Sequence, residues 1–315
     1  MGMSSKIVLI GSGAVGATFA YTVLLKGLAN ELVIIDANQD KAIGDVLDLN
    51  HGLMLATPMK ITAGDYPDCA DADLIVITAG AAQKPGETRI DLMNRNVAIF
   101  DSIIKQILKY NQNGILLIAT NPVDILTQVA LKLSGWDKSR VIGSGTLLDS
   151  SRFRYLIGEK LGVDPRSVHG MIIGEHGDTE VPLWSSMNVA GLVPEKCGET
   201  SRWHLNDEQK EDIYRDTKGA AYQIIQKKGA TYYAIALALA RICEAILKDQ
   251  KSVLPVSSYL DDYHGISGVC LGVPSIVGKN GVEELVPLAI TEEEASKLQH
   301  SAGTLKQFLE QIGFA

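Results

Sequence analysis

Two short segments in the second half of the chain carry residue types that proton-transfer chemistry requires. One is GEHGD, in which His176 precedes a glycine that lets the backbone place an imidazole in a cleft. Histidine exchanges a proton near neutral pH, and a carboxylate neighbour fixes its tautomer and stabilises its charged form. His176 is therefore a candidate acid–base group, although an isolated histidine is more often structural than catalytic.

The other segment is LDSSRFR, which supplies a carboxylate and a guanidinium. Asp149 and Arg152 are three positions apart, so they share one face if the segment is helical. Both residues are therefore candidates for the reaction chemistry. The alternative is an ordinary exposed ion pair at helical spacing. Asp149 is a candidate neighbour for His176, but their separation along the chain leaves that pairing open.

A glycine-rich turn near the N-terminus is typical of a dinucleotide site. The apolar run KIVLI leads into GSGAVG, and a helical pattern follows. Gly11 permits a tight turn, Gly13 lets the backbone approach a pyrophosphate, and Gly16 lets the helix pack closely. Asp36 ends the next apolar run, where a carboxylate binds a ribose 2′-hydroxyl and repels a 2′-phosphate. NAD is therefore favoured over NADP, with an ordinary turn and an ordinary aspartate as the alternatives.

The elements that must position these residues alternate in the first half of the chain. Short apolar runs separated by helical patterns predict parallel strands joined by right-handed crossovers. We therefore expect an α/β fold with a doubly wound parallel sheet. The predicted strands span residues 6–10, 32–35, 60–63, 73–78, 114–120 and 140–143, and the predicted helices include 14–27, 40–50 and 90–110.

The second half of the chain mixes helical patterns with segments typical of antiparallel strands. Its last helix is expected to begin at Thr291-Glu-Glu-Glu and to end before Gly313. We place the domain boundary at residue 143, which gives domains of residues 1–143 and 144–315. The predicted β segments are 168–173, 184–190 and 269–277, and the predicted helices are 147–161, 207–227, 231–248 and 291–312.

Composition and charge exclude several classes of function. The 315 residues are 46% hydrophobic, and the net charge of -8 argues against a general binder of nucleic acid or anionic membranes. The four cysteines form no CxxC pair and the six histidines show no HxxxH or HExxH spacing, so we expect no metal site. Because no run of about 18 apolar residues is free of charge, we expect no membrane span and a cytoplasmic location.

Several segments together resemble the NAD-dependent L-lactate/malate dehydrogenase family, and within it the bacterial L-lactate dehydrogenases most closely. In chain order they are GSGAVG, QKPGETR, ATNPVD, GSGTLLDSSRFR, GEHGDTE and KKGATYY. They cover essentially the whole chain, and GEHGD combined with LDxxR is highly specific. The resemblance implies a Rossmann domain for residues 1–143 and an α+β substrate domain with antiparallel strands for residues 144–315.

The resemblance also implies a role for each matching residue. It makes His176 the general acid/base, Asp149 the carboxylate that orients it, and Arg152 the group that binds the substrate carboxylate. Arg89, which closes QKPGETR, is implied to polarise the substrate carbonyl. The other implied contacts are Asn121 near the reacting oxygen, Thr231 beside the substrate and Ile235 behind the nicotinamide.

The implied NAD contacts lie on the glycine-rich turn, at the ends of predicted strands and near the domain boundary. The implied reaction is reversible hydride transfer between NADH and pyruvate, which gives L-lactate and NAD+. The implied cofactor-binding residues are Gly11, Gly13, Ala14, Val15, Gly16, Asp36, Thr78, Ala79, Gly80, Asn121, Ser144 and Ile235.

Gln83 lies where the family reads the side group of the substrate. Malate dehydrogenases carry an arginine there, which pairs with a second carboxylate. An uncharged amide does not neutralise that charge, and burying it unpaired costs free energy. We therefore expect pyruvate to be accepted and oxaloacetate to be rejected. The alternatives are another L-2-hydroxyacid dehydrogenase, such as a hydroxyisocaproate type, and a non-catalytic descendant that binds a nucleotide or sugar phosphate.

Arg154 and His169 indicate a second site. Arg154 is two positions past Arg152, or about 200° around a helix, so the two arginines face different sides. Taken alone, Arg154 and His169 are typical of ordinary surface residues. The resemblance implies that they bind fructose 1,6-bisphosphate across a subunit interface of a homotetramer, as in allosteric bacterial relatives.

Overall fold

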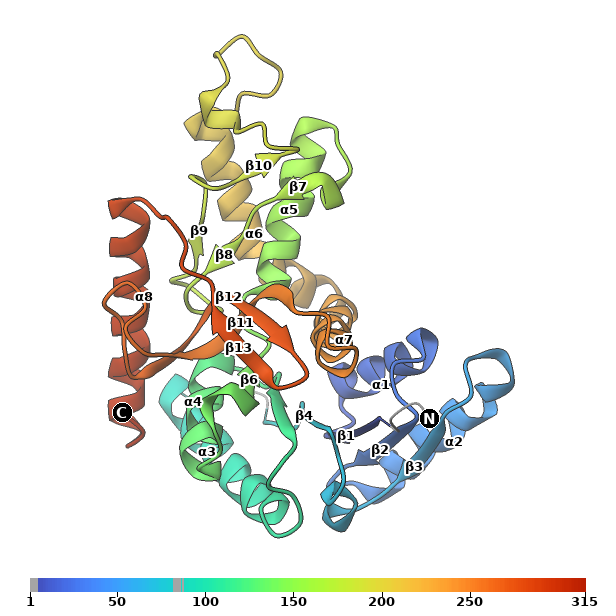
Figure 1. The fold of residues 1–315 in the computed structure, drawn as a ribbon. Coiled ribbons are helices and arrows are strands. Elements are labelled where there is room, and N and C mark those ends of the chain that lie inside the picture. The colour runs from blue at the N-terminus through green and yellow to red at the C-terminus, as the bar shows by residue number, and fades with distance from the viewer. Residues whose placement is uncertain (1–4, 82–85, 87) are drawn as a thin grey trace.

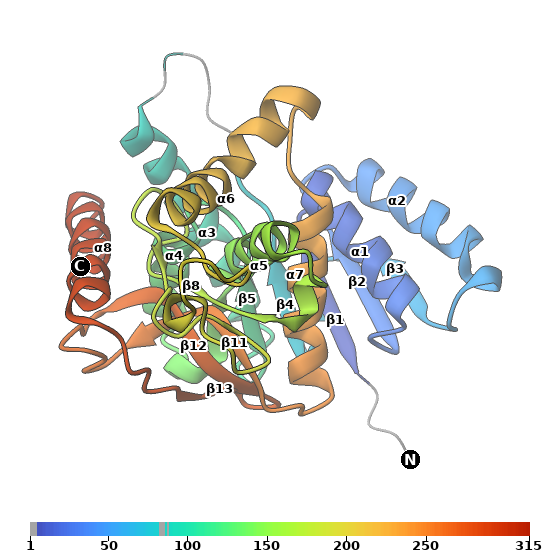
Figure 2. The same ribbon diagram turned by 90° about the horizontal axis from the view of Figure 1, so that it is seen from above.

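A long mixed sheet forms the centre of the molecule (Figures 1 and 2). The computed structural model describes residues 5–81, 86 and 88–315. Within these residues the sheet has nine strands, in the spatial order β13-β12-β11-β6-β5-β4-β1-β2-β3. Neighbours from β6 to β3 pair in parallel, whereas β11, β12 and β13 pair antiparallel. The sheet confirms the predicted fold class, because β3-β2-β1-β4-β5-β6 is the strand order of a Rossmann domain.

The strands are short in the parallel part of the sheet and longer in the antiparallel part. From one edge to the other they are β13 (Gly281–Leu285), β12 (Val269–Gly278), β11 (Ser252–Leu260), β6 (Val141–Gly143), β5 (Ile115–Ile118), β4 (Leu74–Ile77), β1 (Lys6–Ile10), β2 (Glu31–Ile35) and β3 (Lys60–Ala63).

Helices cover both faces of the parallel part. Successive side chains of a strand point to opposite faces, so β1 contributes Val8 and Ile10 to one apolar cluster and Ile7 and Leu9 to another. The first cluster contains residues of α3, α4 and α8, and the second contains residues of α1, α2 and α7. Burial on both faces explains why these strands are continuous apolar runs in the sequence.

The helices that form these layers vary from about three to six turns. No helix in the described part of the chain is long and apolar enough to cross a membrane. Their bounds are α1 (Ala14–Lys26), α2 (Gln39–His51), α3 (Arg89–Ile107), α4 (Val123–Ser134), α5 (Leu147–Leu161), α6 (Asp207–Lys228), α7 (Tyr233–Leu247) and α8 (Glu292–Gln311).

The upper part of Figure 1 holds α5, α6 and two short pairs of strands. Strand β7 (Val168–His169) pairs with β10 (Asn188–Val189), and β8 (Ile172–Ile173) pairs with β9 (Val181–Pro182), both antiparallel. A separate apolar cluster joins α5 to α6 through residues such as Phe153. Helix α5 therefore starts near the end of β6 in the sheet and continues into this upper part.

The structure differs from the predicted elements at several places in the second half. The strand predicted over 168–173 is divided into β7 and β8, and of the segment 184–190 only β10 is a strand in the described structure. Strands β11 and β13 were not predicted. Pro255 of β11 lies opposite Pro274 of β12, and prolines inside a run ordinarily argue against a central strand.

Candidate active site

A cavity of about 400 Å³ opens at the carboxyl end of the parallel strands, where α/β sheets place their ligands. Asn121 and Pro122 form part of its wall just after β5, and Asp149 and Arg152 line it from α5. The other walls come from α3, from α6 and from the loop that follows β8. The remaining lining residues are Leu92, Met93, His176, Gly177, Asp178, Glu180, Lys218, Ala221, Tyr222 and Ile225.

His176, Asp149 and Arg152 meet in this cavity. The Nδ1 atom of His176 lies 2.5 Å from Oδ2 of Asp149, and Nη1 of Arg152 donates to Oδ1 of Asp149 at 2.9 Å. The carboxylate of Asp149 therefore contacts both cations. The sequence leaves the pairing of Asp149 with His176 open, and the structure places the two side chains in contact. When Nδ1–H donates to Asp149, the opposite ring nitrogen Nε2 is left for a substrate.

Asp124 holds the loop that carries His176. The backbone N–H of His176 donates to its Oδ2 at 2.7 Å, and the hydroxyl of Ser257 donates to its Oδ1 at 2.6 Å. Asp124 is only 2% exposed, on the first turn of α4. Burial raises its pKa to about 6, while the hydrogen bonds from Ser257 and His176 oppose that increase. The loop is thus fixed by its backbone as well as by its imidazole.

The electrostatic surroundings favour a protonated His176. Burial lowers the pKa of its imidazole, but the charge and hydrogen bond of Asp149 outweigh burial and raise the pKa to about 9. Burial also raises the pKa of Asp149, yet the neighbouring His176 and Arg152 bring it below the usual range of an aspartate. His176 can therefore supply a proton at neutral pH, while Asp149 stays ionised beside it.

The glycine-rich turn between β1 and α1 has the geometry that a dinucleotide requires. Gly11 has φ +99°, and a Cβ there would lie 2.5 Å from the backbone nitrogen of Ala79. A Cβ on Gly16 would lie 1.9 Å from the carbonyl oxygen of Gly11, so the helix packs directly on the turn. A Cβ on Gly13 would meet nothing within 4 Å. Gly13 is the N-cap of α1 and caps it with no side chain, which leaves helix N–H groups for a phosphate.

Asp36 lies at the end of β2, beside this turn. Its Oδ2 accepts from the backbone N–H of Ser12 at 2.7 Å, and its Oδ1 accepts from the N–H of Asn38 at 2.8 Å. These bonds fix the carboxylate next to the glycine turn, as binding of a ribose hydroxyl requires. The turn and Asp36 therefore fit NAD. Ala14 and Val15 are the first two residues of α1.

The segment after β4 continues along the same edge of the sheet. The hydroxyl of Thr78 donates to the carbonyl oxygen of Gly11 at 2.6 Å. Gly80 lies against Thr120, because a Cβ on Gly80 would come within 2.2 Å of that side chain. Asn96 of α3 then accepts from the N–H of Ala81 at 2.8 Å. Gln83 and the side chain of Arg89 lie outside the described residues.

The other implied residues are spread around the two sites. Ser144 is buried after β6, and its N–H donates to the carbonyl oxygen of Ile118 at 2.8 Å. Ile235 is partly buried at the start of α7 and packs on the cluster beneath α1. Thr231 lies between α6 and α7, and it does not belong to the described lining of the 400 Å³ cavity.

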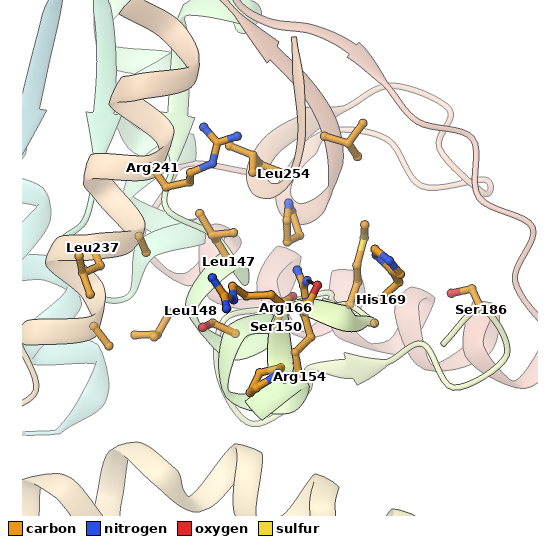
Figure 3. A pocket seen from close by; sticks show the side chains of 18 of the residues that line it. Leu147, Leu148, Ser150, Arg154, Arg166, His169, Ser186, Leu237, Arg241 and Leu254 are labelled. Carbon is orange, nitrogen blue, oxygen red and sulfur yellow. Dashed lines mark hydrogen bonds between the residues drawn. The ribbon is translucent and has the colours of Figure 1, made fainter. Parts of the chain in front are cut away.

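Arg154 and His169 line a different cavity, of about 630 Å³ (Figure 3). Arg154 projects from α5 and His169 from β7, and Arg241 of α7 lies across the same space. Arg152, two residues earlier on α5, lines the 400 Å³ cavity instead. The two arginines therefore serve opposite sides of one helix, as their spacing predicts.

Some residues of the site were missed by reasoning from the sequence. Asp124 and Ser257 hold the His176 loop, and Glu180 and Lys218 line the cavity. The sequence does contain a signal for Asp124, because it is a charged residue inside the apolar helical run VDILTQVAL. Such a residue is rarely buried without a partner, which indicates that it binds another group. Lys218 is one of many lysines on α6, so the sequence offers no signal for it.

Hydride transfer to a small keto acid requires a dinucleotide site, a histidine that carries a proton and an arginine that binds a carboxylate. The fold and the cavity supply residues of these types, which defines the class of protein as an NAD-dependent dehydrogenase. Family models for the lactate/malate dehydrogenase NAD-binding domain and for its alpha/beta C-terminal domain match residues 5–143 and 146–313. The chain belongs to the lactate/malate dehydrogenase family.

Curated relatives and solved structures agree with this assignment. An L-lactate dehydrogenase of Acetivibrio thermocellus is 53% identical over 98% of this chain and 97% of its own. One of Priestia megaterium is 52% identical over 96% and 95%. A crystal structure of a minor L-lactate dehydrogenase from Enterococcus mundtii has a TM-score of 0.95 and 45% identity, covering 98% of both chains. A lactate dehydrogenase from a deep-sea metagenome has a TM-score of 0.96 at 44% identity, covering 98% of this chain and 99% of its own.

Proposed function

We propose that this chain is an L-lactate dehydrogenase, which reduces pyruvate to L-lactate with NADH and catalyses the reverse reaction. The observation that carries the proposal is the contact of His176 with Asp149, at 2.5 Å, in a cavity that Arg152 also lines. The relatives cited above, which are named L-lactate dehydrogenases, support the choice of substrate. We assign cofactor binding to residues 1–143 and the catalytic groups to residues 144–315.

His176 carries the proton of the reaction. Asp149 keeps the imidazole protonated and leaves Nε2–H directed toward the cavity, where it donates its proton to the carbonyl oxygen of the keto acid. NADH, when bound, supplies the hydride that reduces C2 of that acid. In the reverse direction the neutral imidazole takes the proton of the lactate hydroxyl, and the adjacent carboxylate stabilises the resulting imidazolium.

Arg152 orients the substrate. Its Nη1 is held by Asp149, which keeps the guanidinium facing the cavity and leaves further N–H groups for the substrate carboxylate. We assign Arg89 to polarisation of the carbonyl, Asn121 to a hydrogen bond near the reacting oxygen, and Thr231 to the rim of the substrate site. Bound this way, the carbonyl carbon has a fixed position relative to His176.

A steady-state assay of NADH oxidation tests the proposal. Pyruvate, oxaloacetate and a branched 2-keto acid are compared, with wild type, His176→Asn and the surface control His51→Asn. We expect pyruvate to be reduced by wild type and the control, and turnover by His176→Asn to be lost while NADH still binds. A strong preference for the branched acid would instead identify a different 2-hydroxyacid dehydrogenase. Absence of NADH oxidation with any 2-keto acid, with or without fructose 1,6-bisphosphate, would support a non-catalytic binding protein.

We further assign substrate selection to Gln83, whose amide does not neutralise a second carboxylate. Gln83→Arg should shift the ratio of kcat/KM from pyruvate toward oxaloacetate, because the new charge pairs with the distal carboxylate. The measurement is kcat/KM for pyruvate and for oxaloacetate, in wild type and in Gln83→Arg. Unchanged kinetics with both would remove Gln83 as the selecting residue.

The 630 Å³ cavity supports the proposal that fructose 1,6-bisphosphate regulates the enzyme. Arg154, Arg166, His169 and Arg241 line it, and none of its described lining residues is acidic, although the whole chain has a charge of -8. Arg166 pairs with Asp164 at 2.5 Å. Arg154 and His169 are therefore the groups that we assign to the two phosphates.

Titration of the bisphosphate at neutral and acidic pH tests this regulation. We expect it to lower the KM for pyruvate in wild type and in the control Arg215→Gln, whose arginine is an exposed partner of Asp212 on α6. Arg154→Gln and His169→Gln should lose most of that response. No response of wild type at either pH would rule the effector out.

We also propose that the enzyme is a cytoplasmic homotetramer. Large apolar side chains are exposed on several helices, and exposed apolar surface can mark contacts between subunits. They include Tyr21 and Leu25 of α1, Ile43 and Leu47 of α2, and Tyr233 and Leu237 of α7. Sedimentation equilibrium measures the state directly, and a monomer at assay concentration would contradict it.

A further inference from the structure

Glu180 is a buried carboxyl group in the wall of the 400 Å³ cavity. It lies immediately before β9, is 5% exposed, and shares the cavity with Arg152 and His176. Its Oε1 atom has no hydrogen-bond partner among the residues that the structure describes. A carboxyl group so placed is costly unless it is protonated or binds something in the cavity.

The charged groups around Glu180 come from each element packed on it. Helix α5 contributes Asp149 and Arg152, the loop before β9 contributes His176, and α6 contributes Lys218. Lys218 is directed elsewhere, because its Nζ donates to the carbonyl oxygen of Asp178 at 2.7 Å and lies 3.9 Å from its Oδ1.

The backbone of Glu180 is anchored while its carboxyl group faces the site. Tyr214 of α6 donates its hydroxyl to the carbonyl oxygen of Glu180 at 2.7 Å. Burial, and after it the charge of Asp149, raises the pKa of Glu180 to about 8, and the cations His176, Arg152 and Lys218 reduce that increase. Near neutral pH the carboxyl group is therefore mostly protonated and carries no charge toward the substrate.

We propose that Glu180 is a substrate-positioning residue: protonated, it leaves Arg152 free for the substrate carboxylate, and ionised, it opposes that carboxylate. The inference rests on the proposed function, because the substrate is taken to be a small 2-keto or 2-hydroxy acid. Ionised Glu180 would add a second carboxylate, beside Asp149, to the space that holds Arg152 and His176. Repulsion between like charges disfavours a further anion there. Glu180 thereby sets the alkaline limit of substrate binding.

The size of the effect follows from the fraction of protein that is competent to bind. With a pKa of about 8, Glu180 is roughly nine tenths protonated at pH 7 and about one tenth at pH 9. The apparent dissociation constant scales inversely with this fraction, so it should rise about tenfold across that range. Loss of the His176 proton, whose pKa is about 9, adds about a further twofold.

The test compares wild type with Glu180→Gln, which removes the ionisation and keeps the shape of the side chain. The matched control is Glu211→Gln, a change of an exposed carboxylate on α6 outside the cavity. For each protein the KM for pyruvate and the dissociation constant of oxamate, an unreactive analogue of pyruvate, are measured with NADH from pH 6 to 9. Oxamate binding is followed by fluorescence and does not depend on turnover.

We expect both constants to rise about twentyfold between pH 7 and pH 9 in wild type and in Glu211→Gln, and about twofold in Glu180→Gln. Parallel profiles in wild type and Glu180→Gln would overturn the proposal. If oxamate binds with the expected profiles but pyruvate is not reduced, the proposed function fails while the role of Glu180 in binding an anion stands.

Unfolding by urea gives a second, independent measurement. A carboxyl group that is buried at a raised pKa costs no stability below its unfolded pKa of 4.5, and its cost grows until the pH reaches about 8. The urea midpoint of Glu180→Gln should therefore exceed that of wild type increasingly as the pH rises from 4.5 to 8. A constant difference over that range would show that Glu180 titrates normally and would overturn the proposal.

Discussion

His176 owes its proton to a carboxylate that burial alone would neutralise. Asp149 is 2% exposed, and it stays ionised because it contacts His176 on one oxygen and Arg152 on the other. The three groups therefore stabilise one another's charged states, and removing any one changes the protonation of the others. The single side chain of Asp149 therefore contacts both the proposed proton donor and the proposed ligand of the substrate carboxylate.

The first prediction concerns this coupling. In Asp149→Asn the pKa of His176 should fall from about 9 toward its ordinary value of 6.5, because burial and Arg152 still lower it and only the weaker charge of Asp124 still raises it. Titration of the imidazole ring protons by NMR, in the ligand-free protein, measures the change, with His176→Asn to assign the signal. A pKa that stays near 9 would show that Asp149 is not the group that holds the proton.

The sign of this shift has a consequence for stability. A histidine whose folded pKa is raised contributes stability that is complete below pH 6.5 and disappears as the pH passes about 9. Asp149→Asn should therefore lose more stability at pH 6 than at pH 10. Urea unfolding at the two pH values supplies the comparison, with Asp45→Asn on the surface of α2 as control; an equal loss at both would contradict the linkage.

Residues with a strong chemical signature were predictable from the sequence, and those that depend on folding were not. His176, Asp149 and Arg152 belong to motifs whose spacing points to chemistry, whereas their contact is a property of the fold. Glu180 lies in the segment GEHGDTE, but a series of polar residues does not show which side chain faces the cavity. Burial and direction of a side chain are set by the packing of distant elements.

At the scale of elements, α3 connects two segments of the site through one buried side chain. Asn96 is fully buried, accepts from the N–H of Ala81 after β4, and donates to the carbonyl oxygen of Asn121 after β5 at 3.3 Å. Thr88 and Asp91 cap the first turn of the same helix by reciprocal hydrogen bonds. The helix thus fixes both strand ends where the substrate and cofactor sites meet.

The second prediction follows from this connection. Asn96→Ala removes a fully buried side chain and its two part-buried hydrogen bonds, to the N–H of Ala81 and the carbonyl oxygen of Asn121, and should cost about 1–3 kcal/mol of unfolding free energy. It should also raise the KM for pyruvate, because Asn121 lines the cavity. The control is Asn50→Ala, which breaks a bond to the carbonyl oxygen of Ile61 away from the site. Equal effects of both variants on KM would contradict a specific role for Asn96.

The parallel strands were predicted because burial on both faces leaves an unmistakable apolar run, as in KIVLI and LIVI. Strand β11 was missed because SVLPVSSYL combines a proline with three serines. Its partner toward the parallel strands, β6, contacts it through the single pair Ser257 and Gly143 in the described structure. Because so few residues of β11 pair with β6, the strand can contain proline and serine, which are unusual in a central strand. Its composition alone therefore does not predict a strand.

At the scale of the whole molecule, the two halves of the chain share one sheet and the apolar clusters on both of its faces. Strand β11 of the second half continues the sheet beyond β6, and α7 packs on α1 within the same apolar cluster. Figure 1 shows α7 between α1 and the antiparallel strands. The boundary that we place at residue 143 therefore separates functions rather than independent cores.

The third prediction is that residues 1–143 do not fold stably alone. Without α7 and β11, apolar residues such as Phe19 and Ile142 lose the neighbours that bury them. Circular dichroism and calorimetry should show one cooperative transition for the full chain and none for the fragment. A fragment that melts cooperatively near the temperature of the full chain would show that the halves are thermodynamically separate.

A shared sheet also limits how a small molecule enters and leaves. A rigid-body opening of a wide cleft between the halves would have to separate α1 from α7 and break the pairing of β6 with β11. Passage is left to the rim of the cavity, where Tyr222 and Ile225 of α6 are 66% and 48% exposed. The residence time of a bound product then depends on local displacements of this helix. A higher solvent viscosity should therefore slow product release, and more than a change in the packing of the core would.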